Sequence, residues 1–118
     1  MKNYVRIFAL ALLLVTLFSL VVVKGETIHA SSAATASTAE VKIDNFSFGP
    51  QSITVPPGTK VTWTNRDDIP HTVVSTEGVF KSRVLDTDET FSFTFDKPGN
   101  YPYFCSVHPK MTGQIVVK

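Results

Sequence analysis

The chain has 118 residues, with 11 Lys and Arg against 10 Asp and Glu, and a single Cys. One sulfur excludes an internal disulfide framework, a zinc site built from two or four thiolates, and a CxxC redox pair. The length bounds the chain to one small domain, and the nearly balanced charge argues against a protein that binds nucleic acid.

The first segment of the chain is apolar. Residues 7–23 carry no charge and follow a short start that contains Lys2 and Arg6, a pattern typical of a secretory targeting segment. The run exceeds the usual apolar part of a signal peptide and reaches the lower limit for a membrane-spanning helix. Residues 1–30 are therefore expected to be a cleaved signal peptide or a retained membrane anchor. In both cases the basic start predicts export of the remainder, to the periplasm or the extracytoplasmic face of the membrane.

A linker and a small domain follow. Residues 31–39 contain only Ala, Ser and Thr, so we expect a flexible linker that contributes nothing to a core. Residues 40–118 then form the folded domain. A domain of this size without a disulfide would gain stability from a metal ion that ties distant segments together.

The apolar pattern of the domain repeats every two residues. Phe91, Phe93 and Phe95 alternate with polar residues, which predicts half-buried strands, and Pro-, Gly-, Asn- and Asp-rich turns separate such segments. We predict an all-β Greek-key β-sandwich of seven to eight strands with no helix after residue 24. The expected strands are residues 41–44, 52–55, 59–65, 71–75, 82–85, 89–96, 100–105 and 112–117.

Soft metal ligands gather near the C-terminus. Cys105, His108 and Met111 stand three residues apart on a connection between two predicted strands. Thiolate, imidazole and thioether donors favour copper over calcium or magnesium, which prefer oxygen. Of the other histidines, His29 falls in the leader, whereas His71 starts a predicted strand whose end can lie beside this connection. Two His, one Cys and a weak axial Met form the ligand set of a blue-copper electron-transfer site.

Two motifs carry a family resemblance. G-x-Y-x-Y-x-C-x-x-H-P-x-M at residues 99–111 and N-x-x-x-x-P-H at residues 65–71 resemble the cupredoxins, most closely the amicyanins, whose ligand loop has this compact spacing. The resemblance covers essentially the whole domain. It implies that Asn65 hydrogen-bonds across to the Cys loop and holds the two ligand loops together. It also implies one type 1 copper ion, cycling between Cu(I) and Cu(II), with the ligands His71, Cys105, His108 and Met111.

The resemblance implies a function in electron transfer. We expect a monomer that carries single electrons between redox partner proteins, acts on no small-molecule substrate, and has residues 7–23 as its membrane tether if they are retained. Cys105 would supply covalent overlap with copper, and His108 the exposed edge through which the electron leaves. Amicyanins commonly have an aromatic residue where this chain has Lys110, so the expectation does not extend to their usual partner, methylamine dehydrogenase.

Three other functions are compatible with parts of the sequence. Copper delivery or buffering in the periplasm would use the same ligands and stays open as the alternative. An enzymatic copper domain is disfavoured because His ligands of a second centre should flank the Cys, whereas Phe104 and Ser106 flank Cys105. A metal-free adhesion module would leave the Cys-His-Met pattern without a role.

Acidic and aromatic residues of the domain receive structural interpretations. Asp67 and Asp68 are expected to be solvated turn residues, because Asp is favoured in turns. Trp63 and the alternating Phe residues are expected to pack in the core, with no part in binding a cofactor.

Overall fold

The structure is a computed structural model that describes residues 35–118. The predictions for the leader, the apolar segment 7–23 and His29 lie outside the described residues, as does the first part of the expected linker. Within residues 35–118, no helix has the length and apolar character needed to cross a membrane.

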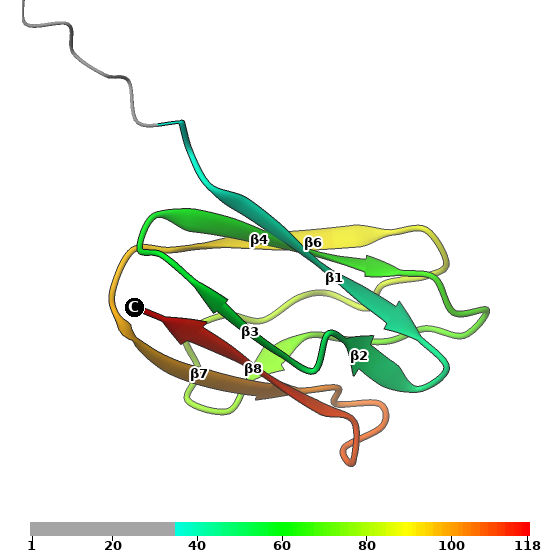
Figure 1. Cartoon of the computed structure of the whole chain (residues 1–118). Helices are drawn as coiled ribbons and strands as arrows, with labels where there is room; N and C mark the ends of the chain where they lie inside the picture. Colours follow the sequence, from blue (N-terminus) through cyan, green and yellow to red (C-terminus); the bar gives the residue numbers. More distant parts are fainter. Residues whose placement is uncertain (1–34) are drawn as a thin grey trace, which may run out of the picture. The chain divides into compact units, whose positions relative to one another are not determined.

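The described residues form two four-stranded sheets that face each other (Figure 1). One sheet has the order β2-β1-β4-β6 and the other β3-β8-β7-β5. Both sheets are mixed, since β1 runs parallel to β4 and β3 parallel to β8. The predicted all-β sandwich is confirmed. Its strands are β1 (Thr38–Asp44), β2 (Ser47–Gly49), β3 (Ser52–Val55), β4 (Thr59–Asn65), β5 (Val74–Ser75), β6 (Thr90–Phe95), β7 (Gly99–Phe104) and β8 (Thr112–Val117).

The structure differs from the expected strands at four points. The expected strand at residues 71–75 is reduced to β5, and His71 forms only an isolated bridge. Residues 82–85 form no strand; this segment contributes only an isolated bridge between Leu85 and His71. The short strand β2 was not expected, and it pairs with β1 in a tight hairpin. Finally, β1 begins at Thr38, inside the expected linker, because backbone pairing with β4 from Lys60 onward requires no bulky side chain.

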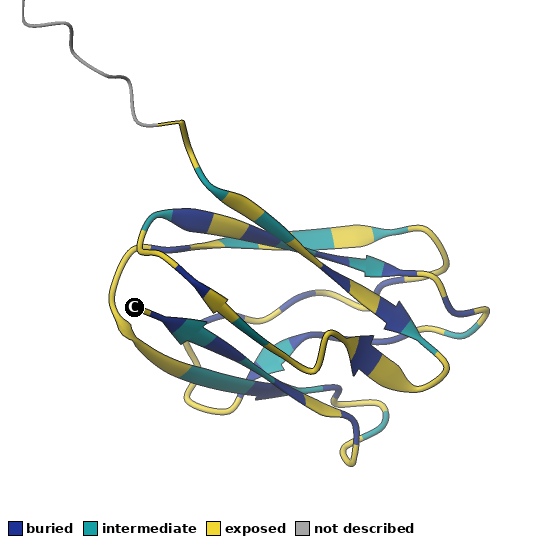
Figure 2. Cartoon of the chain, in the orientation of Figure 1, coloured by how far each residue is buried: buried dark blue, intermediate teal, exposed yellow. Residues whose placement is uncertain are grey.

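The core fills the space between the sheets with alternate residues of the strands (Figure 2). In β4, every second side chain is buried, and Trp63 is fully enclosed. Its ring lies 5.4 Å from that of Tyr103 and 5.7 Å from that of Phe91, measured between centroids. Phe95 is buried as well, and Phe93 packs against the same cluster. The expected packing of Trp63, Phe93 and Phe95 in the core is therefore confirmed.

Three connections meet at one end of the sandwich. The loop after β4 and the loop after β7 come from different sheets and reach the same end, where the β1–β2 hairpin also turns (Figure 1). Loops at the end of a rigid scaffold can bring together side chains that are far apart in sequence. The predicted ligands lie in two of these loops.

Candidate metal centre

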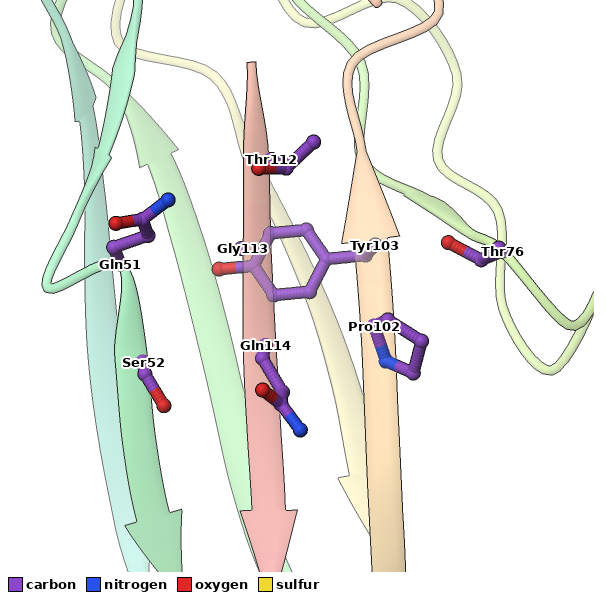
Figure 3. A pocket seen from close by; sticks show the side chains of 8 residues that line it. All are labelled: Gln51, Ser52, Thr76, Pro102, Tyr103, Thr112, Gly113 and Gln114. Atoms are coloured by element: carbon purple, nitrogen blue, oxygen red, sulfur yellow. The ribbon is translucent and has the colours of Figure 1, made fainter. Parts of the chain in front are cut away.

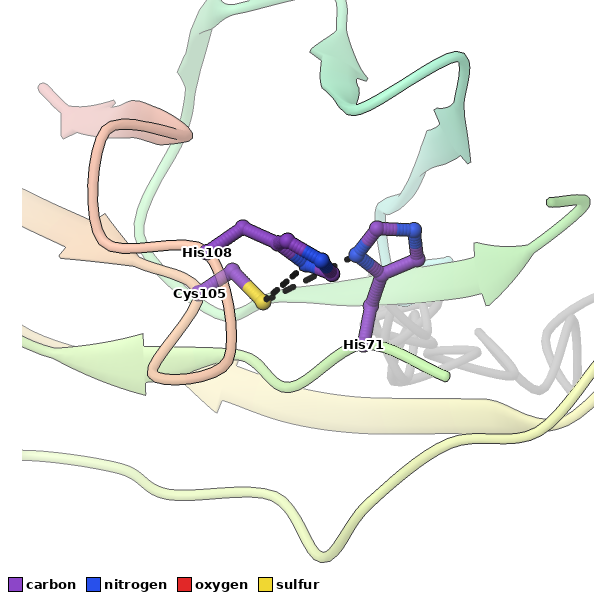
Figure 4. Close-up of side chains that lie close together, drawn as sticks. All are labelled: His71, Cys105 and His108. Atoms are coloured by element: carbon purple, nitrogen blue, oxygen red, sulfur yellow. Dashed lines mark hydrogen bonds between the residues drawn. The ribbon is translucent and has the colours of Figure 1, made fainter. Parts of the chain in front are cut away.

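Three of the four predicted ligands converge at this end of the molecule. The metal-binding atoms of His71, Cys105 and His108 all lie within 4.8 Å of one another. Cys105 Sγ lies 3.7 Å from His71 Nδ1 and 3.8 Å from His108 Nδ1, and Figure 4 shows both rings turned toward the sulfur.

The C-terminal ligand loop is closed by its own backbone. Cys105 directly follows β7, and its N–H donates to Met111 O at 3.0 Å. Met111 N–H in turn donates to His108 O at 2.9 Å, which makes residues 108–111 a tight turn with Pro109 at the second position, where its fixed φ is favoured. Met111 is buried, so the fourth predicted ligand is an enclosed member of this loop.

His71 is fixed by a different contact. The loop after β4 returns alongside residue 85, and the backbones of His71 and Leu85 exchange two hydrogen bonds, at 3.1 and 2.8 Å. Pro70 disfavours a helical conformation at the preceding residue, so the backbone is extended where it approaches His71. The His71 side chain is fully buried.

The spacing of the three donors fits a trigonal metal. Bonds of about 2.0 Å to nitrogen and about 2.3 Å to sulfur, at an angle of about 120°, separate the two donors by about 3.7 Å. The Sγ–Nδ1 distances of 3.7 and 3.8 Å match this value for both histidines. A trigonal His2Cys set next to a methionine is the donor set that accommodates copper in both oxidation states.

The surroundings of Cys105 lower the pKa of its thiol and so favour the thiolate form. Burial by itself raises the pKa of its thiol, but hydrogen bonds from Thr72 N–H and from the side chains of His71 and His108 outweigh this and lower the pKa to about 6. The Thr72 N–H lies 3.4 Å from Sγ. The metal-free site therefore holds its sulfur ionised at neutral pH, as a metal ligand requires.

The two ligand loops are joined by a pair of hydroxyl side chains. Thr72 Oγ1 accepts a hydrogen bond from Ser106 N–H at 2.7 Å and lies 2.7 Å from Ser106 Oγ. The resemblance assigned this bridging role to Asn65, and that assignment is corrected here. The Asn65 amide donates to Ile69 O and Leu85 O, each at 2.9 Å, so Asn65 shapes the His71 loop from within and makes no hydrogen bond to the Cys105 loop.

Asp67 belongs to the site, contrary to its interpretation as a solvated turn residue. It is only 9% exposed, and its Oδ2 lies 3.0 Å from His71 Nε2. The same oxygen accepts a hydrogen bond from Phe46 N–H at 3.1 Å. The Phe46 N–H and the His71 ring lower the pKa of the Asp67 carboxyl. A carboxylate paired with the outer nitrogen of a metal-binding His is a recurrent arrangement, and the Asp-x-x-x-His spacing is the one signal in the sequence that could have indicated it.

A separate hollow lies elsewhere on the described surface. It has a volume of about 400 Å³ and is bordered by Tyr103 and Gly113, with polar residues around them (Figure 3). The Tyr103 ring crosses Gly113 so closely that a Cβ at residue 113 would overlap it. None of the predicted ligands lines this hollow.

Comparisons with known proteins agree with the site. A family model described as a cupredoxin-like domain matches residues 9–117. Amicyanin-alpha from Methylorubrum extorquens is 38% identical over 96 residues, which cover 77% of this chain and 81% of the relative. A solved purple cupredoxin from Nitrosopumilus maritimus matches 68% of this chain and 99% of its own, with 34% identity and a TM-score of 0.64.

A further structural neighbour is much longer than this chain. It is a copper-containing nitrite reductase from Thermus scotoductus, with 33% identity and a TM-score of 0.65. The match covers 69% of this chain but only 22% of the reductase. The fold, the donor set and the family match lead to one conclusion: the chain belongs to the cupredoxin family.

Proposed function

We propose that the protein is a type 1 blue copper protein that carries single electrons between redox partners, with His71, Cys105, His108 and Met111 as the copper ligands. The observation that carries the proposal is the matched pair of 3.7 and 3.8 Å distances between Cys105 Sγ and the two imidazole nitrogens. The donor set and the family of electron carriers to which the relatives belong support the same function.

The mechanism follows from the unequal exposure of the ligands. Bound copper supplies the one-electron Cu(I)/Cu(II) couple. His71 is fully buried, whereas His108 is partly exposed at the end of the molecule. His108 is therefore the ligand edge through which an electron reaches a docked partner. Cys105 provides covalent overlap with the metal.

The ligand loops are held in place before any metal binds. The turn at residues 108–111, the bridge from His71 to Leu85 and the Thr72–Ser106 pair each fix one part of the site. Electron transfer is fast when the ligands keep their positions as the metal changes oxidation state. This preorganisation favours electron transfer over copper delivery, because a delivery protein needs mobile ligands that release the metal ion.

Several further properties are part of the proposal. The protein would act outside the cytoplasm as a monomer, with residues 7–23 directing export and acting as a tether if they are retained. It would not be an enzyme, because Phe104 and Ser106 flank Cys105, where an enzymatic copper domain would place His ligands of a second centre. Lys110 is exposed next to Met111, where amicyanins commonly have an aromatic residue, so we propose a redox partner other than methylamine dehydrogenase.

A visible spectrum tests the function. Cu(II) is added to the purified protein, and the spectrum is recorded before and after ascorbate and again after reoxidation. We expect an intense blue band that bleaches and returns. A pale product would contradict a site in which a thiolate binds copper. A blue band that does not return on reoxidation, because copper has been released, would favour the delivery function.

A further inference from the structure

One residue beside the metal centre has a conformation that its side chain disfavours. Asn45 and Phe46 form the two-residue loop between β1 and β2, with φ angles of 48° and 55°. Such loops favour Asn followed by Gly, because both residues need a positive φ. Asn tolerates this region, but a bulky aromatic residue is an outlier there and carries backbone strain.

Burial does not compensate for this strain. Phe46 is 53% exposed, so its ring gains little from the core. A strained and exposed aromatic residue suggests a role in function rather than in folding.

The Phe46 ring lies against both histidine ligands. Its centroid is 5.0 Å from that of His108, with an interplanar angle of 89°, and 5.9 Å from that of His71, with an angle of 87°. Both are edge-to-face contacts, the favourable geometry for aromatic rings. Phe46 also lines a groove of about 180 Å³ together with Met111. The ring therefore adjoins the exposed side of the predicted metal centre.

We propose that Phe46 is a lid that retains the metal ion by holding the two imidazoles in position and shielding them from water. The inference rests on the proposed copper site and adds a retention function to it. Loss of copper to a competing ligand requires an imidazole to move away, and His108 is the more exposed of the two. The Phe46 ring blocks that movement on one side. The strain at residue 46 would then serve to keep copper bound, in a protein that must keep its metal while it exchanges electrons.

The hairpin offers a matched pair of substitutions. Phe46→Gly removes the ring and the strain but keeps the backbone N–H that donates to Asp67. Asn45→Gly removes strain from the same loop but leaves the ring in place. Comparing the two separates the effect of the lid from a general change in the hairpin.

The test is the rate at which EDTA removes Cu(II), followed by the loss of the blue band. We expect Phe46→Gly to lose copper at least tenfold faster than the unmodified protein, and Asn45→Gly to lose it at the unmodified rate. Phe46→Leu, which keeps an apolar side chain but has no ring, should give an intermediate rate and serves if the glycine variant does not fold. An unchanged rate in Phe46→Gly and Phe46→Leu, or equal acceleration in Asn45→Gly, would overturn the proposal.

Two additional readouts complete the test. Metal-free Phe46→Gly should unfold at the same or a higher denaturant concentration than the unmodified protein, because the strain is gone; a clear loss of stability would make the residue a folding element and overturn the lid. The blue band and its cycling with ascorbate should persist in all variants. That property reports on the proposed function separately, whether or not the release rates change.

Discussion

Asp67 and His71 form a buried pair in which a carboxylate oxygen lies 3.0 Å from the ring nitrogen that faces away from Cys105. With copper bound at Nδ1, the proton of a neutral His71 ring would lie on Nε2 and form the hydrogen bond to Asp67. The carboxylate thus fixes both the tautomer and the orientation of the ring. Through Phe46 N–H, the same oxygen also connects the β1–β2 hairpin to the site.

Replacing Asp67 by Asn should weaken metal binding. The substitution keeps the size of the side chain but removes the charge that orients His71, and changes of this kind lower metal affinity by about 10- to 100-fold. Asp68→Asn is the matched control, since the neighbouring Asp68 is exposed. Copper affinity is measured by competition with a chelator. Equal affinities in the two variants would show that Asp67 has no positioning role.

The sulfur ligands should respond differently to substitution. Cys105→Ser removes the thiolate and should abolish the blue band. Met111→Leu removes only a weak donor to Cu(II), so that variant should stay blue and show a higher reduction potential, because the oxidised state is stabilised less. Absorption spectra and voltammetry measure both effects. A blue Cys105→Ser variant would disprove the ligand assignment.

The stability of the metal-free protein should rise with pH across the range in which the Cys105 thiol ionises. The pKa of this thiol is about 6 in the folded chain, against an ordinary value of 9.0. Because the folded pKa is depressed, the thiolate favours the folded state; its contribution is complete above about pH 9 and is lost as the pH falls toward 6. Denaturant unfolding at several pH values measures the slope. Cys105→Ser should flatten the slope in this window, and an unchanged slope would argue against a depressed pKa.

Thr72 should matter for stability as well as for the site. Thr72→Val removes the buried oxygen that accepts the Ser106 N–H, and an unsatisfied donor costs about 1–3 kcal/mol of unfolding free energy. Thr62→Val is the control, because Thr62 Oγ1 and Ser92 Oγ form a similar pair at 2.8 Å on the exposed face of the sheet. That control should change stability by less than about 0.5 kcal/mol. Urea unfolding of the metal-free variants compares them, and similar losses would show that the loop bridge is dispensable.

The sequence predicted the metal ligands better than the residues that hold them in position. Cys105, His108 and Met111 lie within one short loop, so their spacing in the sequence already reflects their spacing in the structure. Asp67 and Thr72 act on partners that only the fold brings near: Asp67 accepts the N–H of Phe46 from the β1–β2 hairpin, and Thr72 meets Ser106, which lies 34 residues away in the sequence. No local pattern distinguishes such residues from ordinary turn or strand residues.

The same contrast applies to the strands. Long alternating segments such as β4 and β6 were predicted within a residue or so, because one face of each strand is buried. The three residues of β2 are too few to show a period, and its last residue, Gly49, together with the following Pro50 indicates a turn. Residues 82–85 alternate weakly and form only a bridge; their backbone bonds to the facing segment are confined to His71 and Val73.

The parallel pairing of β1 with β4 gives the domain a polarity. β4 leads into the His71 loop at its C-terminal end, so the start of β1, at Thr38, lies at the opposite pole, about 20 Å away along the strand. The chain upstream of Thr38 therefore joins the domain at the end opposite the His71 loop. The end of the domain that carries His108 and Phe46 is thus opposite the point where the upstream chain enters.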